Sequence, residues 1–166
     1  MASTYSQIST TTLGSSTASV TLSNIPQTYT NLVLITTVSS ARSGNASTYL
    51  RLNGDTASNY SFTVLYGDGS SAFSTRGSSQ TEIWYGQTNG FSTTNAIGQY
   101  AYINQYSNIS TFKSVISRGG HAGQLVFTGV GLWRSTAAIT SITIFGEGGF
   151  NLIAGNTFTL YGIKGA

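Results

Sequence analysis

The chain has 166 residues, no cysteine, 7% charged residues and a formal net charge of +3 at pH 7. This length fits one ordinary domain, and the lack of cysteine excludes disulfides and thiol chemistry. The seven basic residues are scattered singly, whereas nucleic-acid binding needs a concentrated basic face, so we expect no direct nucleic-acid partner.

Hydroxyl groups take the place of the missing charges. The sequence has 25 serines and 25 threonines beside ten tyrosines and eight phenylalanines. So many aromatic residues argue against disorder, and threonine and aromatic side chains suit a pleated, half-buried surface. The composition therefore indicates an all-β protein.

Short runs of alternating apolar and polar residues predict four strands in the first half. These strands cover residues 17–22, 31–38, 47–52 and 60–66. The run 31–38 is apolar on both faces at its start, which favours a central strand of a sandwich. Turn sequences "NGD" and "GDGSS" follow the third and fourth runs.

The second half continues the same pattern. It predicts strands over residues 81–85, 98–103, 111–117 and 124–132. Two closing runs follow: Ile142 and Ile144 share a face of the first, and Phe158 and Leu160 share a face of the second. A glycine-rich connection, longer than a tight hairpin, joins these two runs.

About ten short strands predict an all-β fold, a two-sheet antiparallel β-sandwich. A jelly roll is the first expected topology and an immunoglobulin-like Greek key the second. Residues 1–16 read as an N-terminal arm or a loosely held first strand, and residues 17–166 as a single β-sandwich domain.

The start of the chain lacks the basic residues and apolar core of a signal peptide, and no apolar run reaches the ~20 residues that span a bilayer. We expect synthesis in a cytoplasm, no export signal and no membrane partner. Strand edges are usually protected by lysine, proline or inward charges, yet the chain has two lysines and one proline. This shortage predicts that other subunits cover the edges, in a homo-oligomer.

Residues for catalysis or metal binding are sparse. His121 lies between glycines in "SRGGHAGQ", which indicates a loop or bulge. Asp55 and Asp68 lie in predicted turns, and the spacing leaves open whether any acids, such as Glu82 and Glu147, converge. With one histidine and no cysteine, a structural zinc site is excluded. We expect no enzyme activity, no catalytic residue, no metal and no cofactor.

Aromatic residues are the remaining candidates for a site. Trp84 and Tyr85 follow each other in a predicted strand, so one of them is expected to be exposed, and Trp133 with Arg134 is expected at a rim of the sandwich. Such residues anchor subunit contacts or stack on sugar rings. Residues 1–16 and the closing strands are further contact candidates.

The ending "WRSTAAITSITIFGEGGFNLIAGNTFTLYGIK" resembles a recurrent ending of tailed-bacteriophage virion proteins, in which a glycine-rich segment leads into a closing strand pair. "LNGDTASNYSFTVLYGDGS" and "INQYSNISTFKSV" are similar to earlier segments of that pattern, so the likeness spans roughly residues 48–164. Such modules form β-sandwich parts of head-decoration (cement) proteins and of tail-fibre or receptor-binding tips, and many are trimeric.

The resemblance implies a virion structural protein without catalytic residues. Because the module fills nearly the whole chain, it favours a capsid decoration protein on the head exterior, with the major capsid protein as partner. The alternative is a receptor-binding or carbohydrate-binding module of a tail fibre or tail tip, with a host-surface glycan as partner.

Overall fold

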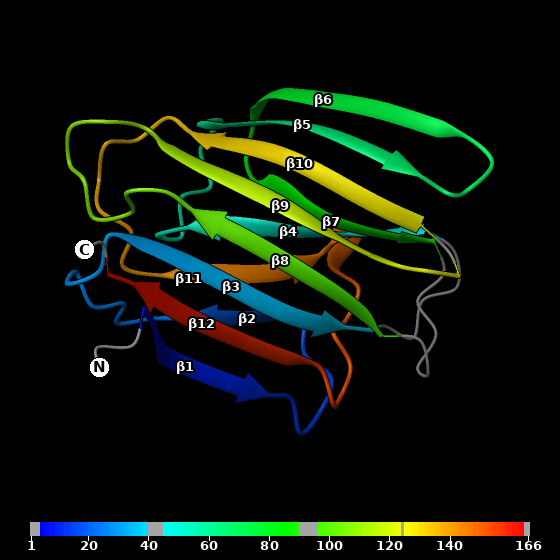
Figure 1. Cartoon of the computed structure of the whole chain (residues 1–166), viewed down its shortest axis with the longest axis horizontal. Coiled ribbons are helices and arrows are strands. Elements are labelled where there is room, and N and C mark those ends of the chain that lie inside the picture. The colour runs from blue at the N-terminus through cyan, green and yellow to red at the C-terminus, as the bar shows by residue number, and fades with distance from the viewer. Residues whose placement is uncertain (1–3, 40–44, 90–95, 124, 165–166) are drawn as a thin grey trace.

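The computed structural model describes residues 4–39, 45–89, 96–123 and 125–164. They form two antiparallel sheets packed face to face (Figure 1), which confirms the predicted sandwich. The larger sheet has eight strands in the order β1-β12-β3-β8-β9-β10-β5-β6. Its strands are β1 (Tyr5–Thr12), β12 (Thr157–Ile163), β3 (Asn31–Val38), β8 (Ile97–Ile103), β9 (Lys113–His121), β10 (Leu125–Trp133), β5 (Tyr60–Gly67) and β6 (Ala72–Gln80).

The smaller sheet has four strands in the order β2-β11-β4-β7. Its strands are β2 (Ser19–Leu22), β11 (Ile142–Gly146), β4 (Asn45–Leu52) and β7 (Ile83–Asn89). A single 3₁₀ turn, η1 (Glu147–Gly149), lies between β11 and β12 within the described residues.

The order of the strands is that of a jelly roll. The chain changes sheet at every step from β1 to β5, and again from β6 to β7, β7 to β8, β10 to β11 and β11 to β12. This gives the quartets β1-β12-β3-β8 and β2-β11-β4-β7. The hairpins β9–β10 and β5–β6 extend the first quartet on the side of β8. The first of the two expected topologies is therefore confirmed.

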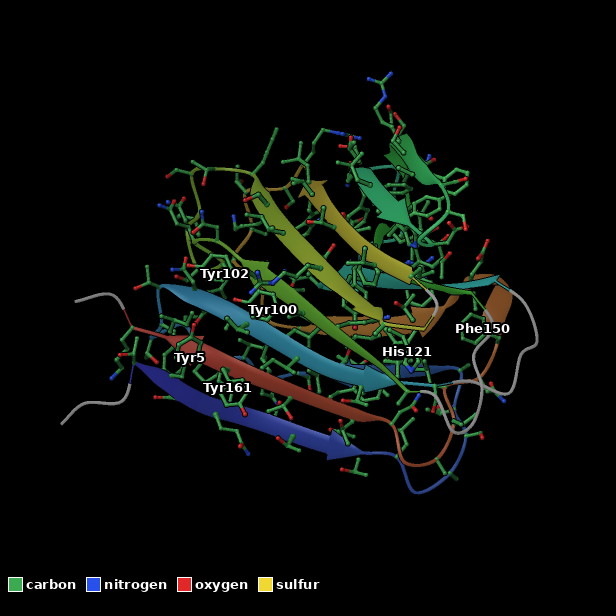
Figure 2. The ribbon with its side chains drawn as sticks, turned by 45° about the vertical axis from the view of Figure 1, so that its right-hand side comes forward. Tyr5, Tyr100, Tyr102, His121, Phe150 and Tyr161 are labelled. Carbon is green, nitrogen blue, oxygen red and sulfur yellow. The ribbon has the colours of Figure 1, made fainter. Side chains whose placement is uncertain are left out.

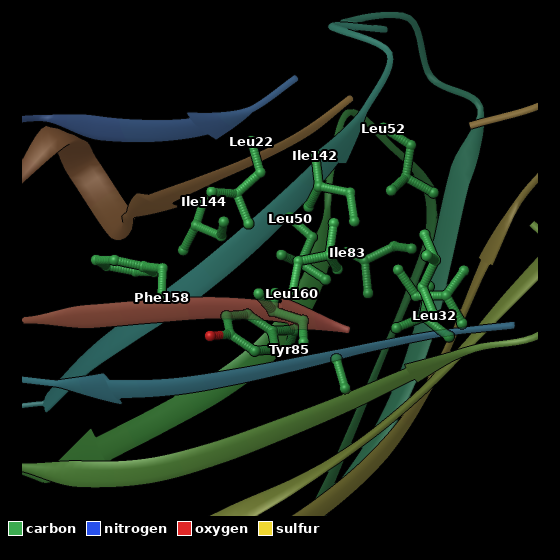
Figure 3. Packing of buried hydrophobic residues seen from close by; sticks show 14 of the residues in the cluster. Leu22, Leu32, Leu50, Leu52, Ile83, Tyr85, Ile142, Ile144, Phe158 and Leu160 are labelled. Carbon is green, nitrogen blue, oxygen red and sulfur yellow. The ribbon is translucent and has the colours of Figure 1, made fainter. Parts of the chain in front are cut away.

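The core lies between the two sheets and is built from inward residues of both (Figure 3). Leu50, Ile142 and Ile144 from the smaller sheet and Phe158 and Leu160 from the larger sheet have no exposed surface. Burying one such side chain stabilises the fold by roughly 1.5–3 kcal/mol. The alternation seen in the closing runs therefore marks true core positions.

Those two closing strands do not pair with each other. β11 lies between β2 and β4, and β12 lies between β1 and β3. Both are interior strands whose backbone groups pair within the monomer. The expectation of a closing strand pair is wrong, and the connection is long because it crosses from one sheet to the other.

The N-terminal segment contains a paired strand. β1 pairs with β12 from Tyr5 opposite Ile163 to Thr12 opposite Thr157, with one irregularity between Gln7 and Ser9. It forms one edge of the larger sheet, and β6 forms the other. The strand β6 was not predicted, because "AFSTRGSSQ" shows no apolar alternation and most of its side chains are exposed.

Candidate interaction surface

Trp84 and Tyr85 are both buried, with 7% and 1% of their surface exposed. The indole N–H of Trp84 donates to the carbonyl of Gly86 over 2.7 Å, and the Tyr85 hydroxyl lies 2.6 Å from the Thr36 hydroxyl oxygen. Burial raises the pKa of Tyr85 far above its ordinary value. The expectation that one of the two rings is exposed is therefore wrong.

Trp84 is covered because the hairpin β5–β6 reaches past the edge strand β7. Phe62 and Tyr66 of β5 meet the Trp84 ring edge-to-face, with centroids 5.9 and 5.7 Å away. Phe73 of β6 stacks on Tyr66 from further out. Because side chains alternate along β7, Trp84 points to the outer face of the four-stranded sheet. There the β5–β6 end of the eight-stranded sheet curls over it.

Trp133 and Arg134 also act within the monomer. Trp133 is 2% exposed, stacks on Tyr60 with ring centroids 6.2 Å apart, and donates its indole N–H to Asp55. Arg134 donates to the carbonyls of Ser58 and Tyr60. Both residues thus fix the segment that leads into β5, and the Trp133 ring offers almost no surface to a partner.

The two aspartates predicted in turns take that role. The Asp55 carboxylate accepts the backbone N–H of Ala57, and the Asp68 carboxylate accepts those of Ser70 and Ser71. These backbone bonds hold the pKa of Asp68 below its ordinary value.

His121 ends β9 and accepts the backbone N–H of Gly123 on Nδ1. It lies with Asp68 around a hollow of about 440 Å³. Among the residues that the structure describes, no three potential metal ligands come together. No helix in this part of the chain is both long enough and apolar enough to cross a membrane.

Apolar side chains gather instead on the outer face of the eight-stranded sheet. The register aligns Tyr161, Val33, Tyr102, Ile116 and Val130 in one row across β12, β3, β8, β9 and β10. Val33 has no exposed surface although it points outward, since it lies between two tyrosines in this row. Figure 2 shows Tyr102 and Tyr161 on the same side of the sheet.

A second row runs parallel to the first. It contains Ile35, Tyr100, Arg118, Thr128 and Leu65 on β3, β8, β9, β10 and β5. The Arg118 guanidinium lies 5.0 Å from the centre of the Tyr100 ring, a cation–π contact. Its charge therefore lies against the aromatic ring.

We call this surface the apolar face. It comprises Ile35, Leu65, Tyr100, Tyr102, Ile116, Val126 and Val130. The five aliphatic members are 44–66% exposed. Together with the two tyrosines of β8, the exposed aliphatic residues of β3, β9, β10 and β5 form a patch across five neighbouring strands, of the kind that marks protein–protein contact sites.

A hollow of about 380 Å³ opens at one end of the apolar face. Leu65 and Val126 line it together with Tyr66 and Phe73, and its walls are almost entirely apolar. Such a hollow can accept an apolar side chain from a partner.

The sequence contains a local signal for this surface. In β9 and β10 alternate residues face the core, and the residues between them face outward, where polar side chains are expected. Ile116, Val126 and Val130 occupy such outward positions although they are apolar. Outward apolar residues in one strand are ordinary. Their alignment into rows depends on pairings between β3, β8, β9, β10 and β5 that no local pattern reveals.

No protein-family model matches the chain, and no curated protein matches it. Among solved structures, the chain is similar to the galectin LEC-6 of Caenorhabditis elegans at 7% identity and a TM-score of 0.35, covering 94% of this chain and 96% of that one. A scytalido-glutamic peptidase bound to a transition-state analogue inhibitor is similar at 12% identity and a TM-score of 0.27, covering 91% and 66%. Likenesses this weak carry no argument about function.

Proposed function

We propose that the chain is a non-enzymatic structural protein of a bacteriophage virion, a capsid decoration (cement) subunit that associates with copies of itself through the apolar face. The sequence resemblance supports the virion role. The single observation that carries the proposed self-association is the exposed apolar face on the eight-stranded sheet.

A second copy of this chain is the partner that suits the face best. Arg118 is the charged residue within the two rows, and it is already stacked on Tyr100. The face therefore offers little charge by which a strongly charged partner could be selected. Another copy brings an equally uncharged, hydroxyl-rich and aromatic surface, since 7% of the chain is charged.

The burial energies reach the lower part of the cost of association. The five aliphatic side chains are 44–66% exposed, so burying the rest of each contributes roughly half of the 1.5–3 kcal/mol that full burial is worth. Association costs roughly 4–15 kcal/mol of translational and rotational freedom, and the five residues together offset the lower part of that range. On a capsid, many copies are held close to one another, and the high effective concentration strengthens their association further. The trimeric state and the contact with the major capsid protein are proposed from the sequence resemblance.

Sedimentation equilibrium of the purified protein tests the self-association. The wild type should form an oligomer, with a trimer expected. Substituting both Ile116 and Val130 by Glu should give a monomer with an unchanged far-ultraviolet circular dichroism spectrum. The two positions face each other on neighbouring strands, so association would bury two like negative charges side by side.

Thr12 and Thr157 provide a matched control, since they are also cross-strand neighbours on the same sheet but lie at its far margin. The double Glu variant at these positions should remain oligomeric. A wild type that sediments as one chain at all concentrations would overturn the proposed self-association, as would equal behaviour of the two variants.

The virion role is tested by locating and counting the protein in purified phage particles, with gold-labelled antibody and quantitative mass spectrometry. Hundreds of copies over the head are expected of a decoration protein. A handful of copies at the tail would instead favour the receptor-binding alternative, and absence from particles would contradict both.

A further inference from the structure

A groove of about 480 Å³ crosses the outer face of the four-stranded sheet, on the opposite side of the sandwich from the apolar face. Strands β2, β4 and β11, the residue before β7 and the turn η1 form its walls. Its main side chains are Tyr49, Arg51, Glu82, Thr143, Phe145 and Glu147. Two acids whose convergence could not be read from the sequence, Glu82 and Glu147, thus line one groove.

Two aromatic rings form the floor of the groove. Tyr49 and Phe145 are opposite each other on β4 and β11, with ring centroids 5.8 Å apart and planes tilted by 30°. Both are half-buried, and the part of each ring that remains exposed lines the groove. Together they give a firm apolar platform.

Arg51 is fixed over the Phe145 ring of this platform. Its guanidinium lies 4.4 Å from the centre of the Phe145 ring, its Nη2 donates to Glu82 over 3.0 Å, and its Nε donates to the carbonyl of Thr81. A guanidinium carries five N–H groups in a rigid plane. These contacts fix the orientation of the guanidinium plane, and they thereby also fix the directions of its remaining N–H groups.

The turn η1 brings Glu147 to the rim. Gly148 and Gly149 have φ of 63° and 77°, a conformation that glycine adopts readily and other residues rarely adopt. The "GEGG" segment therefore has a structural reason, which is to turn the chain so that Glu147 stands over β4. Burial, and then the charge of Glu147, raises the pKa of Tyr49 above its ordinary value.

These features suit one class of ligand. A pyranose ring has C–H groups on one face and hydroxyls around its edge, so it can lie on the platform while its hydroxyls meet donors and acceptors at the rim. Two carboxylates against one guanidinium disfavour an anionic sugar. We infer that this groove binds an uncharged oligosaccharide, with Arg51, Glu147 and the hydroxyl of Tyr49 contacting its hydroxyls.

The inference goes beyond the proposed assembly role and stands independently of it. Assembly through the apolar face leaves the groove open, because the two surfaces lie on opposite sides of the sandwich. It assigns the sugar contacts to Tyr49 and Phe145. Trp84 lies next to Tyr49 across the β4–β7 pairing but is buried, as is Trp133.

An array of neutral hexose and N-acetylhexosamine oligosaccharides is the first test, followed by calorimetric titration of the ligand that binds best. The Tyr49→Phe and Glu147→Gln variants, which keep the shape of the side chain, should each weaken binding by about five- to tenfold, as expected for the loss of one hydrogen bond. Matched controls are Tyr161→Phe on the opposite face and Asp68→Asn in the β5–β6 turn, and both should bind like the wild type.

Retention of no neutral oligosaccharide at millimolar concentration would overturn the inference. Binding that is unchanged in both groove variants would overturn it as well, and a loss in Tyr161→Phe alone would place the sugar on the other sheet. Because the oligomeric state is measured separately, failure of this inference is distinguishable from failure of the proposed assembly.

Discussion

Trp133 donates its indole N–H to Oδ2 of Asp55 over 2.7 Å, which joins the end of β10 to the turn that follows β4. The same carboxylate oxygen accepts the side-chain N–H of Asn59. The bond from Asn59 and then that from Trp133 hold the pKa of Asp55 below its ordinary value. A residue predicted only as a turn former thus also fixes a buried indole.

We expect Asp55→Ala to destabilise the fold by about 1–3 kcal/mol, because the buried indole N–H of Trp133 loses its acceptor. Urea denaturation followed by tryptophan fluorescence measures the change. Asp68→Ala is the control: its carboxylate caps an exposed turn without holding a buried side chain. Equal losses in the two variants would show that the indole contact contributes nothing beyond turn formation.

Gly131 should not tolerate a methyl group. A Cβ added there would lie 2.4 Å from Cγ2 of Ile83, an atom close to the backbone of β7 that cannot move aside freely. Gly131→Ala should therefore cost roughly 1–3 kcal/mol through overpacking. Gly98→Ala is the matched strand control, since nothing lies within 4 Å of its added Cβ. Thermal denaturation of both variants checks the difference, and similar melting temperatures would refute it.

Tyr60 predicts a loss of stability in alkaline solution. Its hydroxyl accepts the backbone N–H of Leu52, and burial raises the pKa of Tyr60 from 10.0 to about 12. A raised pKa in the folded state means that its contribution is complete below pH 10 and is lost as the pH rises from 10 to about 12. Urea denaturation across this range should show a shallower decline for Tyr60→Phe than for the wild type. Parallel declines would contradict the assignment.

The hydroxyl of Tyr85 links the two sheets through Thr36, which lies 2.6 Å away in β3. Tyr85→Phe should cost about 1 kcal/mol because a buried hydrogen bond is lost. The double variant Tyr85→Phe with Thr36→Val should cost less than the sum of the single variants, since each single change leaves one hydroxyl without this partner. Additive losses in urea denaturation would show that the two hydroxyls do not interact.

Much of the fold could be predicted because alternation is a local property. The run 31–38 is predicted to be a central strand, and β3 lies between β12 and β8. The strand β6 could not be predicted in the same way. β6 is a strand because its backbone pairs with β5 across the "GDGSS" turn. Its side chains are mostly exposed, so the sequence shows no alternation of apolar and polar residues there.

The site was harder to predict because exposure depends on distant strands. Alternation correctly places Trp84 and Tyr85 on opposite sides of β7, but the curl of β5 and β6 over that strand buries Trp84. The same long-range pairings align Ile116 and Val130 on the outer face. A single sequence carries the residues of such a surface but not their alignment.

The jelly-roll order also constrains how the chain reaches its native state. The hydroxyls of Thr10 and Thr159, 149 positions apart, meet across β1 and β12, and those of Thr21 and Thr143, 122 positions apart, meet across β2 and β11. Closing loops of this length slows folding. On the ribosome, the hairpins β5–β6 and β9–β10 can form during synthesis, whereas β1 and β2 must wait, unpaired and open to aggregation, until the last strands emerge.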